Sequence, residues 1–279
     1  MTAAPGDSTT QGGQRFTGRI AVITGGASGI GKSCAEVLAA QGALVVIADL
    51  DLVGATRVAD GLAGRAYAID LGHAPDIDVF ARRVEREVGP VDMLVNAAGI
   101  IQGAALPPQE LALETYDRVF AVNLRGTYAA CAAFGRHMAA RHRGAILNIA
   151  SIAGMRSTPL HAYGPMKAAV IQLTENLATE WGRSGVRVNC LSPGPVLTPA
   201  LQDAISKGQR DRERMENSMA SGQLVMPREV AMAAAFLLSD EASAITGVNL
   251  PVDHGWLVAS PWASFGGVRP RLPTSKEFS

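Results

Sequence analysis

The stretch that decides the fold is TGGASGIG at residues 24–31, where one expected element passes directly into another. It completes the run RIAVITGG (19–26), which is short, apolar and rich in β-branched residues and so predicts a buried strand. It opens GKSCAEVLAAQG (31–42), whose apolar residues recur at helical spacing up to a glycine. Glycines at such a junction let the backbone approach a ligand closely, and the N–H groups that start a helix favour a phosphate. The stretch therefore predicts a phosphate-binding turn.

The same alternation of strand and helix continues along the chain. Further strands are expected at 43–51, 92–99, 144–151 and 186–194, and helices at 116–142, 167–182 and 228–240. Near-continuous apolar strands separated by helices indicate a parallel sheet that is covered on both faces. The expected fold class is α/β, with a single Rossmann-type doubly wound parallel β-sheet and helices on both of its faces.

The sequence divides into three segments. Residues 1–14 are small and polar and are expected to form a disordered N-terminal segment. No stretch between 15 and 258 has the composition of a linker, so these residues are expected to form one domain. Residues 259–279 are rich in proline, glycine and aromatic side chains and are expected to be an irregular C-terminal tail with no regular element.

Composition and charge narrow the class of protein. A length of 279 residues suits one large α/β domain, and 25 basic side chains balance 25 acidic ones, so neither nucleic acid nor a membrane is an expected partner. Three scattered cysteines, Cys34, Cys131 and Cys190, fit neither a disulfide framework nor a metal site and indicate a reducing compartment. Without a signal peptide or an apolar run near ~18 residues, the expected location is cytoplasmic.

An acidic residue, Asp49, ends the second expected strand. Its carboxylate is placed to accept hydrogen bonds from the ribose of an adenosine nucleotide. The same carboxylate would repel a 2′-phosphate, and neither Ser28 nor Leu50 offers the arginine or lysine that would bind one. The pattern therefore predicts NAD as the cofactor in preference to NADP.

A tyrosine and a lysine stand one helical turn apart in YGPMK at 163–167, so their side chains share one face of a helix. Pro165 is tolerated only in a first helical turn, which means that this helix should begin close to Tyr163. A tyrosine has an unperturbed pKa of about 10, and a nearby lysine ammonium would lower it. The pair is therefore a candidate proton-exchanging site.

From about residue 15 to residue 258 the chain resembles the short-chain dehydrogenase/reductase family, because several motifs occur in the family's order. TGGASGIG resembles its cofactor loop, NAAG (96–99) is similar to its signature after the fourth strand, and ITGVNLPVDHG (245–255) resembles its last strand. The resemblance implies that residues 15–258 form a dinucleotide-binding catalytic domain. It implies cofactor contacts, besides Asp49, at Gly25, Ser28, Gly29, Ile30, Gly31, Asp70, Asn96, Ala97, Gly99, Tyr163, Lys167, Pro193, Gly194, Val196 and Thr198.

The resemblance also implies a catalytic set of Asn123, Ser151, Tyr163 and Lys167. Tyr163 would exchange a proton with an alcohol or ketone while hydride passes to or from the cofactor, and Ser151 would hold the same oxygen. Lys167 would also bond the nicotinamide ribose, and Asn123 would hold a water linking the lysine to solvent. The implied activity is the interconversion of a secondary alcohol and a ketone.

The substrate side is less defined by the sequence. Gln102, Arg156 and His161 are candidate substrate contacts, together with the segment 195–225. That segment contains DAISKGQRDRERMEN (203–217), which is expected to be a charged amphipathic helix serving as a mobile lid. Polar groups around the pocket favour a polyol, a sugar or a hydroxy acid.

Two other functions stay open at this point. One is a 3-oxoacyl thioester reductase, which would need a basic docking patch for a carrier protein near the active site. The other is a non-catalytic nicotinamide-binding sensor, although a sensor has no need of the proton-exchanging residues.

An oligomer is a further expectation. The resemblance implies a homotetramer or a homodimer that associates through the helices 116–142 and 167–182. The tail carries Trp256, Trp262 and Phe265, and three large aromatic side chains close together are expected to be packed against something. The tail is expected to cover either its own domain or a neighbouring subunit.

Overall fold

The computed structural model describes residues 14–270 of the chain. The expected disordered segment 1–14 therefore lies almost wholly outside the described residues, as do the last nine residues of the expected tail, 271–279.

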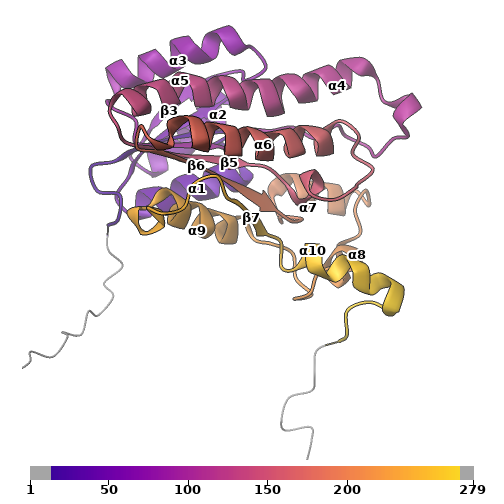
Figure 1. Ribbon diagram of the computed structural model, residues 1–279. Helices are drawn as coiled ribbons and strands as arrows, with labels where there is room; N and C mark the ends of the chain where they lie inside the picture. The colour runs from indigo at the N-terminus through magenta and orange to yellow at the C-terminus, as the bar shows by residue number, and fades with distance from the viewer. Residues whose placement is uncertain (1–13, 271–279) are drawn as a thin grey trace, which may run out of the picture.

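Within the described residues, seven parallel strands form one sheet in the order β3-β2-β1-β4-β5-β6-β7 (Figure 1). The strands are β1 Ile20–Thr24, β2 Leu44–Asp49, β3 Arg65–Ala68, β4 Met93–Asn96, β5 Gly144–Ile149, β6 Val186–Pro193 and β7 Asn249–Val252. The order runs outward in both directions from β1 and β4, so the chain reverses its winding between them. The expected doubly wound parallel sheet is confirmed, and the crevice at this reversal is where such sheets bind ligands.

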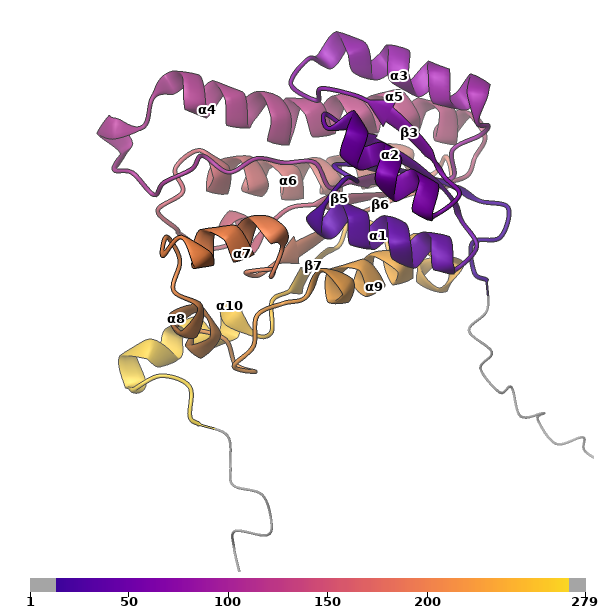
Figure 2. The ribbon, with the colours of Figure 1, turned by 180° about the vertical axis from the view of Figure 1, so that it is seen from behind.

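Two layers of helices cover the sheet, one on each face (Figures 1 and 2). The layer on one face has α1 Gly29–Ala40, α2 Leu52–Gly61 and α9 Pro227–Leu238. The layer on the other has α3 Ala74–Glu87, α5 Thr127–Ala140 and α6 Tyr163–Gly182. Strand β1 shows why the apolar runs are continuous: Ala21 and Ile23 face the first layer, Val22 faces the second, and all three are fully buried.

Strand β3 and the helices α2 and α3 have no specific counterpart in the sequence-based expectation. The strand has only four residues, RAYA, none of them β-branched, and it lies at the edge of the sheet beside β2 alone. A short edge strand gives little apolar periodicity, because it is buried by a neighbour on one side only.

The expected single helix 116–142 is wrong in its middle. The structure has α4 Leu113–Phe120, then a π-helical turn over Ala121–Gly126, then α5. Within this wider turn the side-chain oxygen of Asn123 accepts a hydrogen bond from the N–H of Ile100, and its side-chain nitrogen donates one to the carbonyl of Ile100. The helical pitch changes at the residue that makes these two contacts.

The expected helix over 203–217 is also wrong. Two short helices, α7 Pro199–Ser206 and α8 Arg212–Asn217, are separated at Gly208, whose φ is +69°. Each helix begins at its own cap: Thr198 Oγ1 accepts a hydrogen bond from the N–H of Leu201, and Asp211 Oδ1 accepts one from the N–H of Arg214. Residues 207–211 therefore end one helix and start another.

The start of the C-terminal tail is more regular than expected. The chain forms α10 Trp256–Ala259 and then a 3₁₀-helix over Ser260–Phe265. These turns lie beside α8 in both views of the molecule (Figures 1 and 2). Trp262 is 50% exposed and Phe265 is 86% exposed, so within a single chain the expected packing of these two aromatic side chains is incomplete.

Among residues 14–270, no helix combines the length and the apolar character needed to cross a membrane.

Candidate active site

The turn after β1 is built by the close approach of backbone to backbone. Gly25 has a φ of +68°, and a Cβ on it would lie 2.6 Å from the backbone of Ala98 in the next strand-end loop. A Cβ on Gly31 would lie 2.2 Å from the carbonyl oxygen of Gly25. A side chain at either position would push the turn open, so both glycines are required by space, and Gly25 is required by its conformation as well.

Helix α1 begins immediately after the turn with free N–H groups. In the described structure Ser28, at its N-cap, accepts no hydrogen bond from them with its side chain. Such unpaired donors and the helix dipole favour an anion. The methyl group of Thr198 lies over the same turn, 3.3 Å from where a Cβ on Gly29 would be. The structure thus brings together the turn and the segment after β6, both of which the sequence predicts to contact the cofactor.

The carboxylate of Asp49 is held by backbone on both sides. Its Oδ2 accepts a hydrogen bond from the N–H of Ala27 at 3.0 Å, and its Oδ1 accepts one from the N–H of Asp51 at 3.0 Å. The side chain therefore has a fixed orientation at the end of β2, and each oxygen keeps a lone pair for a further donor.

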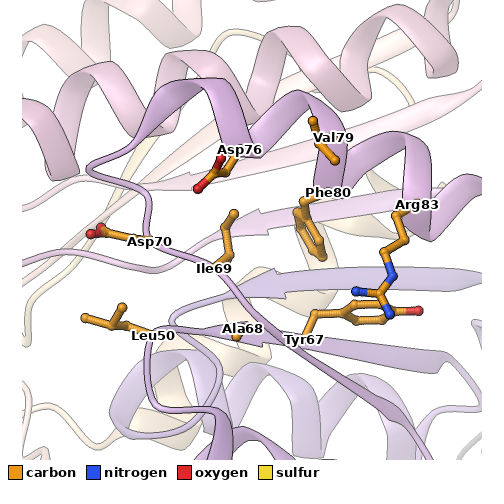
Figure 3. A pocket seen from close by; sticks show the side chains of 9 residues that line it. All are labelled: Leu50, Tyr67, Ala68, Ile69, Asp70, Asp76, Val79, Phe80 and Arg83. Carbon is orange, nitrogen blue, oxygen red and sulfur yellow. The ribbon is translucent and has the colours of Figure 1, made fainter.

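Asp70 lies at the rim of a cavity of about 310 Å³ (Figure 3). Its Oδ1 accepts a hydrogen bond from the N–H of Gly72 at 2.7 Å. Leu50 lies at the same end of the cavity, while at the other end Arg83 stacks over the ring of Tyr67 at 5.0 Å. The cavity follows the edge of the sheet from the ends of β2 and β3, where the sequence predicts the adenine side of the cofactor.

Asn96 is turned into the protein. Its Nδ2 donates to Asn148 Oδ1 at 2.9 Å and to the Cys131 sulfur at 3.2 Å, and the residue is buried. The side chain therefore ties β4 to β5, and a cofactor contact at this position would have to come from its backbone.

Asn123 fixes the loop that follows β4. Its Oδ1 accepts from the N–H of Ile100 and its Nδ2 donates to the carbonyl of Ile100, each at 2.8 Å. A Cβ on Gly99 would lie 3.4 Å from Asn123 Oδ1 and 3.5 Å from Lys167 Nζ. Three of the predicted site residues are thus within contact of one another.

Lys167 is 4% exposed, and its Nζ donates to the carbonyl of Ile149 at 2.7 Å. Burial lowers the pKa of this ammonium to about 8, and the neighbouring Cys190 partly opposes that change. The Nζ lies 5.5 Å from the centroid of the Tyr163 ring, which confirms that the two side chains share one face of α6.

Tyr163 is the first residue of α6, where the proline in its motif requires the helix to begin. Burial raises the pKa of its phenol above the ordinary value, and a hydrogen bond with Ser151 partly offsets this rise. The pKa of Tyr163 is therefore raised rather than lowered as the sequence predicted from Lys167, because loss of hydration dominates. The structure does bring the phenol and the Ser151 hydroxyl together.

The three candidate substrate residues differ in their placement. Gln102 is buried, and its Oε1 accepts hydrogen bonds from the N–H groups of Ala162 and Tyr163. Arg156 and His161 are exposed, and Arg156 donates to the carbonyl of Met155 beside it. Only Gln102 touches the catalytic set through a hydrogen bond in the described structure.

The segment after β6 is tied to neighbouring elements by backbone contacts. The N–H of Gly194 donates to the carbonyl of Val252 in β7, and Val196 pairs with Val225 in an isolated bridge. Pro193 is the last residue of β6, and Thr198 caps α7. These contacts carry the segment across the carboxyl ends of the strands, toward the glycine turn.

Sequence reasoning did not find the polar residues beneath the site. Asn148 Nδ2 donates to Thr174 Oγ1 at 2.9 Å, and the Cys190 thiol lies near both Thr174 and Lys167. Thr174 follows Lys167 by two turns of α6, so helical spacing could have placed it on the same face. For Cys190 the sequence held no comparable signal, because Cys190 lies in β6, where nearly all residues are buried and a buried cysteine does not stand out.

The arrangement can exchange a proton between the Tyr163 phenol and a bound oxygen. Ser151 is positioned to orient that oxygen, and the buried ammonium of Lys167 to stabilise a phenolate. The glycine turn and the fixed Asp49 carboxylate lie at the ends of the neighbouring strands β1 and β2, where a phosphate and a ribose would be separate contacts of one dinucleotide.

Comparison with known proteins agrees with this geometry. A family model described as enoyl-(acyl carrier protein) reductase matches residues 25–257. D-threitol dehydrogenase from Mycolicibacterium smegmatis is 38% identical over 250 residues, which are 88% of this chain and 95% of that protein. NAD-dependent glycerol dehydrogenase from Listeria innocua is 34% identical over 246 residues, 87% of this chain and 95% of that protein.

Two solved structures extend the likeness to the fold. A crystal structure described as ribose-5-phosphate isomerase from Brucella melitensis has a TM-score of 0.90 and 51% identity, and the match covers 93% of this chain and 100% of that one. A short chain dehydrogenase/reductase family protein has a TM-score of 0.78 and 34% identity, covering 87% of this chain and 99% of that one. The chain therefore belongs to the short-chain dehydrogenase/reductase family, whose members are oxidoreductases that use a nicotinamide cofactor on small-molecule substrates.

Proposed function

We propose that this protein is an NAD-dependent dehydrogenase/reductase that interconverts a secondary alcohol and a ketone, with polyols, sugars or hydroxy acids as the favoured substrate class. The observation that carries the proposal is the half-buried Tyr163 side chain, which lies beside Ser151 and has its ring centroid 5.5 Å from the ammonium of the buried Lys167. A surface tyrosine and lysine would have no reason to be held in this way.

The residues present fit a dinucleotide. The turn excludes any Cβ at Gly25 and Gly31, so a diphosphate could lie against its backbone and the first N–H groups of α1. Asp49 would bind the adenosine ribose, with Asp70 beside the adenine and Thr198 toward the nicotinamide. The bound cofactor supplies the acceptor or donor of hydride.

Residues of the chain itself transfer the proton. In alcohol oxidation, Tyr163 as phenolate takes the hydroxyl proton, and in ketone reduction the phenol returns it. Ser151 donates a hydrogen bond to the same substrate oxygen and so holds it within reach of the phenol. Lys167 supplies positive charge beside the phenolate, while Asn123 holds the loop at Ile100 that lies against this lysine.

NAD is the proposed cofactor rather than NADP. The support is the orientation of Asp49, whose two oxygens are both fixed by backbone N–H groups. A carboxylate that cannot turn away would repel a 2′-phosphate more effectively than a freely rotating one. The glycerol dehydrogenase relative is described as NAD-dependent, which agrees with the proposal.

The favoured substrate class rests on the relatives as well as on the site. Two of them are described as D-threitol and glycerol dehydrogenases, and both threitol and glycerol are short polyols. The test is a screen of threitol, erythritol, glycerol, sorbitol and gluconate with NAD and with NADP, following the absorbance of the reduced cofactor. Turnover of a polyol with NAD is expected, and its absence with every compound would remove the proposal.

A second candidate, reduction of a 3-oxoacyl thioester, is supported by the likeness to a solved structure described as a 3-oxoacyl-[acyl-carrier protein] reductase from Brucella melitensis, with a TM-score of 0.78 and 30% identity. Its test is the oxidation of NADH or NADPH in the presence of acetoacetyl-pantetheine. Turnover of this thioester far faster than that of any polyol would make it the better proposal.

The isomerase description of one solved structure points to another chemistry. Isomerisation of a sugar phosphate consumes no nicotinamide cofactor and would leave the glycine turn and Asp49 without a use. Conversion of ribose 5-phosphate by the protein freed of nucleotide would favour that reading, whereas a requirement for NAD would favour the present one.

We also propose that the protein acts as a homo-oligomer, a dimer or tetramer, in the cytoplasm. The exposed Trp262 and Phe265 in the tail, and the exposed Tyr128 on α5, support association. The cysteines are all unpaired and buried, as suits a reducing compartment. Light scattering of the purified protein and fractionation of its native cells test the two proposals.

A further inference from the structure

Gln102 makes a contact that an ordinary loop glutamine does not make. The residue is 7% exposed, and its Oε1 accepts hydrogen bonds from the N–H of Ala162 at 2.8 Å and from the N–H of Tyr163 at 3.2 Å. These two N–H groups stand at the very start of α6, where a helix has no carbonyl of its own to offer. One side-chain oxygen therefore holds the backbone of the residue that carries the reactive phenol.

The orientation of the Gln102 amide is settled by its partners. Only the oxygen can accept from two N–H groups, so the amide nitrogen must point away from α6. That nitrogen, Nε2, is buried and has no hydrogen-bond partner among the described residues. A buried donor without an acceptor is unfavourable and uncommon in native proteins. The hydrogen-bonding capacity of this nitrogen is therefore unused within the described residues.

The surroundings of Gln102 are consistent with a bound molecule. Gln102 lines a cavity of about 380 Å³ together with Ile101 and three polar side chains of α4, Glu114, Thr115 and Arg118. The loop that carries Gln102 starts at Ile100. The backbone of Ile100 is held by two hydrogen bonds to the side-chain amide of Asn123, beside Lys167. The Gln102 side chain therefore lies between the first residue of α6 and this cavity.

We infer that Gln102 has two roles in the reaction proposed above, on which this inference rests. Its Oε1 positions Tyr163 by holding the start of α6. Its Nε2 donates a hydrogen bond to a second oxygen of the substrate, separate from the oxygen that Tyr163 and Ser151 hold. Gln102 is thus a positioning residue and also a specificity residue that favours substrates with an acceptor oxygen near the reacting carbon.

The two roles separate in two variants. Gln102→Glu keeps an acceptor oxygen for the start of α6 but replaces the donor by another acceptor. Gln102→Met keeps the length and volume of the side chain but removes both groups. Gln109→Glu, at an exposed position of the same loop, is the control for the added negative charge.

The substrates are two pairs of ketones that differ by an oxygen in place of a methylene. The pairs are 1-methoxypropan-2-one with pentan-2-one, and 4-methoxybutan-2-one with hexan-2-one, each reduced with NADH. An ether oxygen only accepts hydrogen bonds, so a glutamate cannot replace the amide donor by reversing the bond. In at least one pair the wild type should prefer the ether, and Gln102→Glu should reduce that ratio of kcat/KM roughly 5- to 30-fold.

The positioning role is read on the ketones that lack the second oxygen. Gln102→Met should lower kcat for pentan-2-one without changing the Kd of NADH, and Gln102→Glu should restore kcat to within a few fold of the wild type. Unchanged ratios in Gln102→Glu for both pairs would overturn the specificity role, and wild-type kcat in Gln102→Met would overturn the positioning role. If the wild type reduces none of the four ketones and oxidises no polyol, the proposed function fails and takes the inference with it.

Discussion

Two regions face each other along the carboxyl edge of the sheet, and they are built in different ways. The glycine turn at 24–31 is defined by backbone against backbone, with no space for a Cβ at Gly25 or Gly31. The segment 195–225 opposite consists of two short helices with side-chain caps, separated at Gly208, where a Cβ would meet no atom within 4 Å. The glycines of the first region tolerate almost no change, whereas the two short helices of the second contain no buried residue and can vary without disturbing the sheet. This difference suits a constant cofactor and a variable substrate.

The largest effect is expected at Tyr163, which lies outside both regions. Tyr163→Phe removes the proton-exchanging hydroxyl and should lower turnover by roughly 10²- to 10⁴-fold. The Kd of NAD, measured by fluorescence titration, should stay nearly constant because the glycine turn is untouched. Activity within a few fold of the wild type would contradict the role of Tyr163.

A pair of glycine substitutions tests the comparison directly. In Gly31→Ala the new Cβ would lie 2.2 Å from the carbonyl oxygen of Gly25, so we expect a loss of about 2–4 kcal/mol in the free energy of unfolding. In Gly208→Ala only the positive φ of +69° is penalised, at about 1 kcal/mol. Urea unfolding of both variants measures the difference, and equal losses would show that the two regions are equally constrained.

Asp49→Ala should change the choice of cofactor. Removing the fixed carboxylate should narrow the preference for NAD over NADP by roughly 10- to 100-fold in kcat/KM, mainly through KM. Asp211→Ala is the matched control in the opposite region, because Asp211 only caps α8. Equal efficiency of the wild type with both cofactors would refute the role of Asp49, as would a similar shift in the control.

The role proposed for Lys167 requires a buried positive charge, which lowers the free energy of unfolding. Its pKa is lowered to about 8 by burial, against about 10.4 in an unfolded chain, so below pH 8 the folded state must keep a buried charge. Lys167→Met should therefore be more stable than the wild type by about 1–3 kcal/mol at pH 7, while losing activity.

The sign of the pH dependence follows from the same pKa. Between about pH 8 and pH 10.4 the unfolded chain binds the proton that the folded chain has lost, so wild-type stability rises with pH relative to Lys167→Met. The difference between the two proteins should shrink over this range in parallel urea titrations. A constant difference from pH 7 to pH 10 would contradict the lowered pKa.

The smallest effect is expected at the tail. Truncation before Pro261 removes the exposed Trp262 and Phe265, and should weaken the oligomer and change the substrate KM by a few fold while NAD still binds. This outcome would mean that the tail of a neighbouring subunit packs beside the segment 195–225 and completes the substrate side of the site. Unchanged elution on a sizing column together with unchanged kinetics would show that the tail is dispensable.

The sequence predicted the glycine turn at 24–31 better than the segment 195–225, for physical reasons. Buried strands and the glycine turn leave a periodic or compositional signal, because burial on both faces and the absence of a Cβ restrict the residue types allowed. The start of α6 at Tyr163 followed in the same way from Pro165. The break at Gly208 and the π-helical turn at Asn123 did not, since each depends on contacts made after folding. The Gln102 amide shows the same limit: its sequence position indicated a pocket, but not which atom would lack a partner.

The position of β7 has a consequence for how copies of the protein can meet. The carbonyl of Val252 accepts a hydrogen bond from the N–H of Gly194, just after β6, and the carbonyl of Val248 accepts one from the N–H of Cys190 in β6. Because residues of a strand alternate in direction, Pro251 stands where a backbone N–H would face away from the sheet. Proline has no such N–H, so the outer edge of β7 lacks a donor that another strand would need to extend the ladder. Copies that approach along this edge must associate through their side chains, and growth of the sheet from one molecule into the next is disfavoured there.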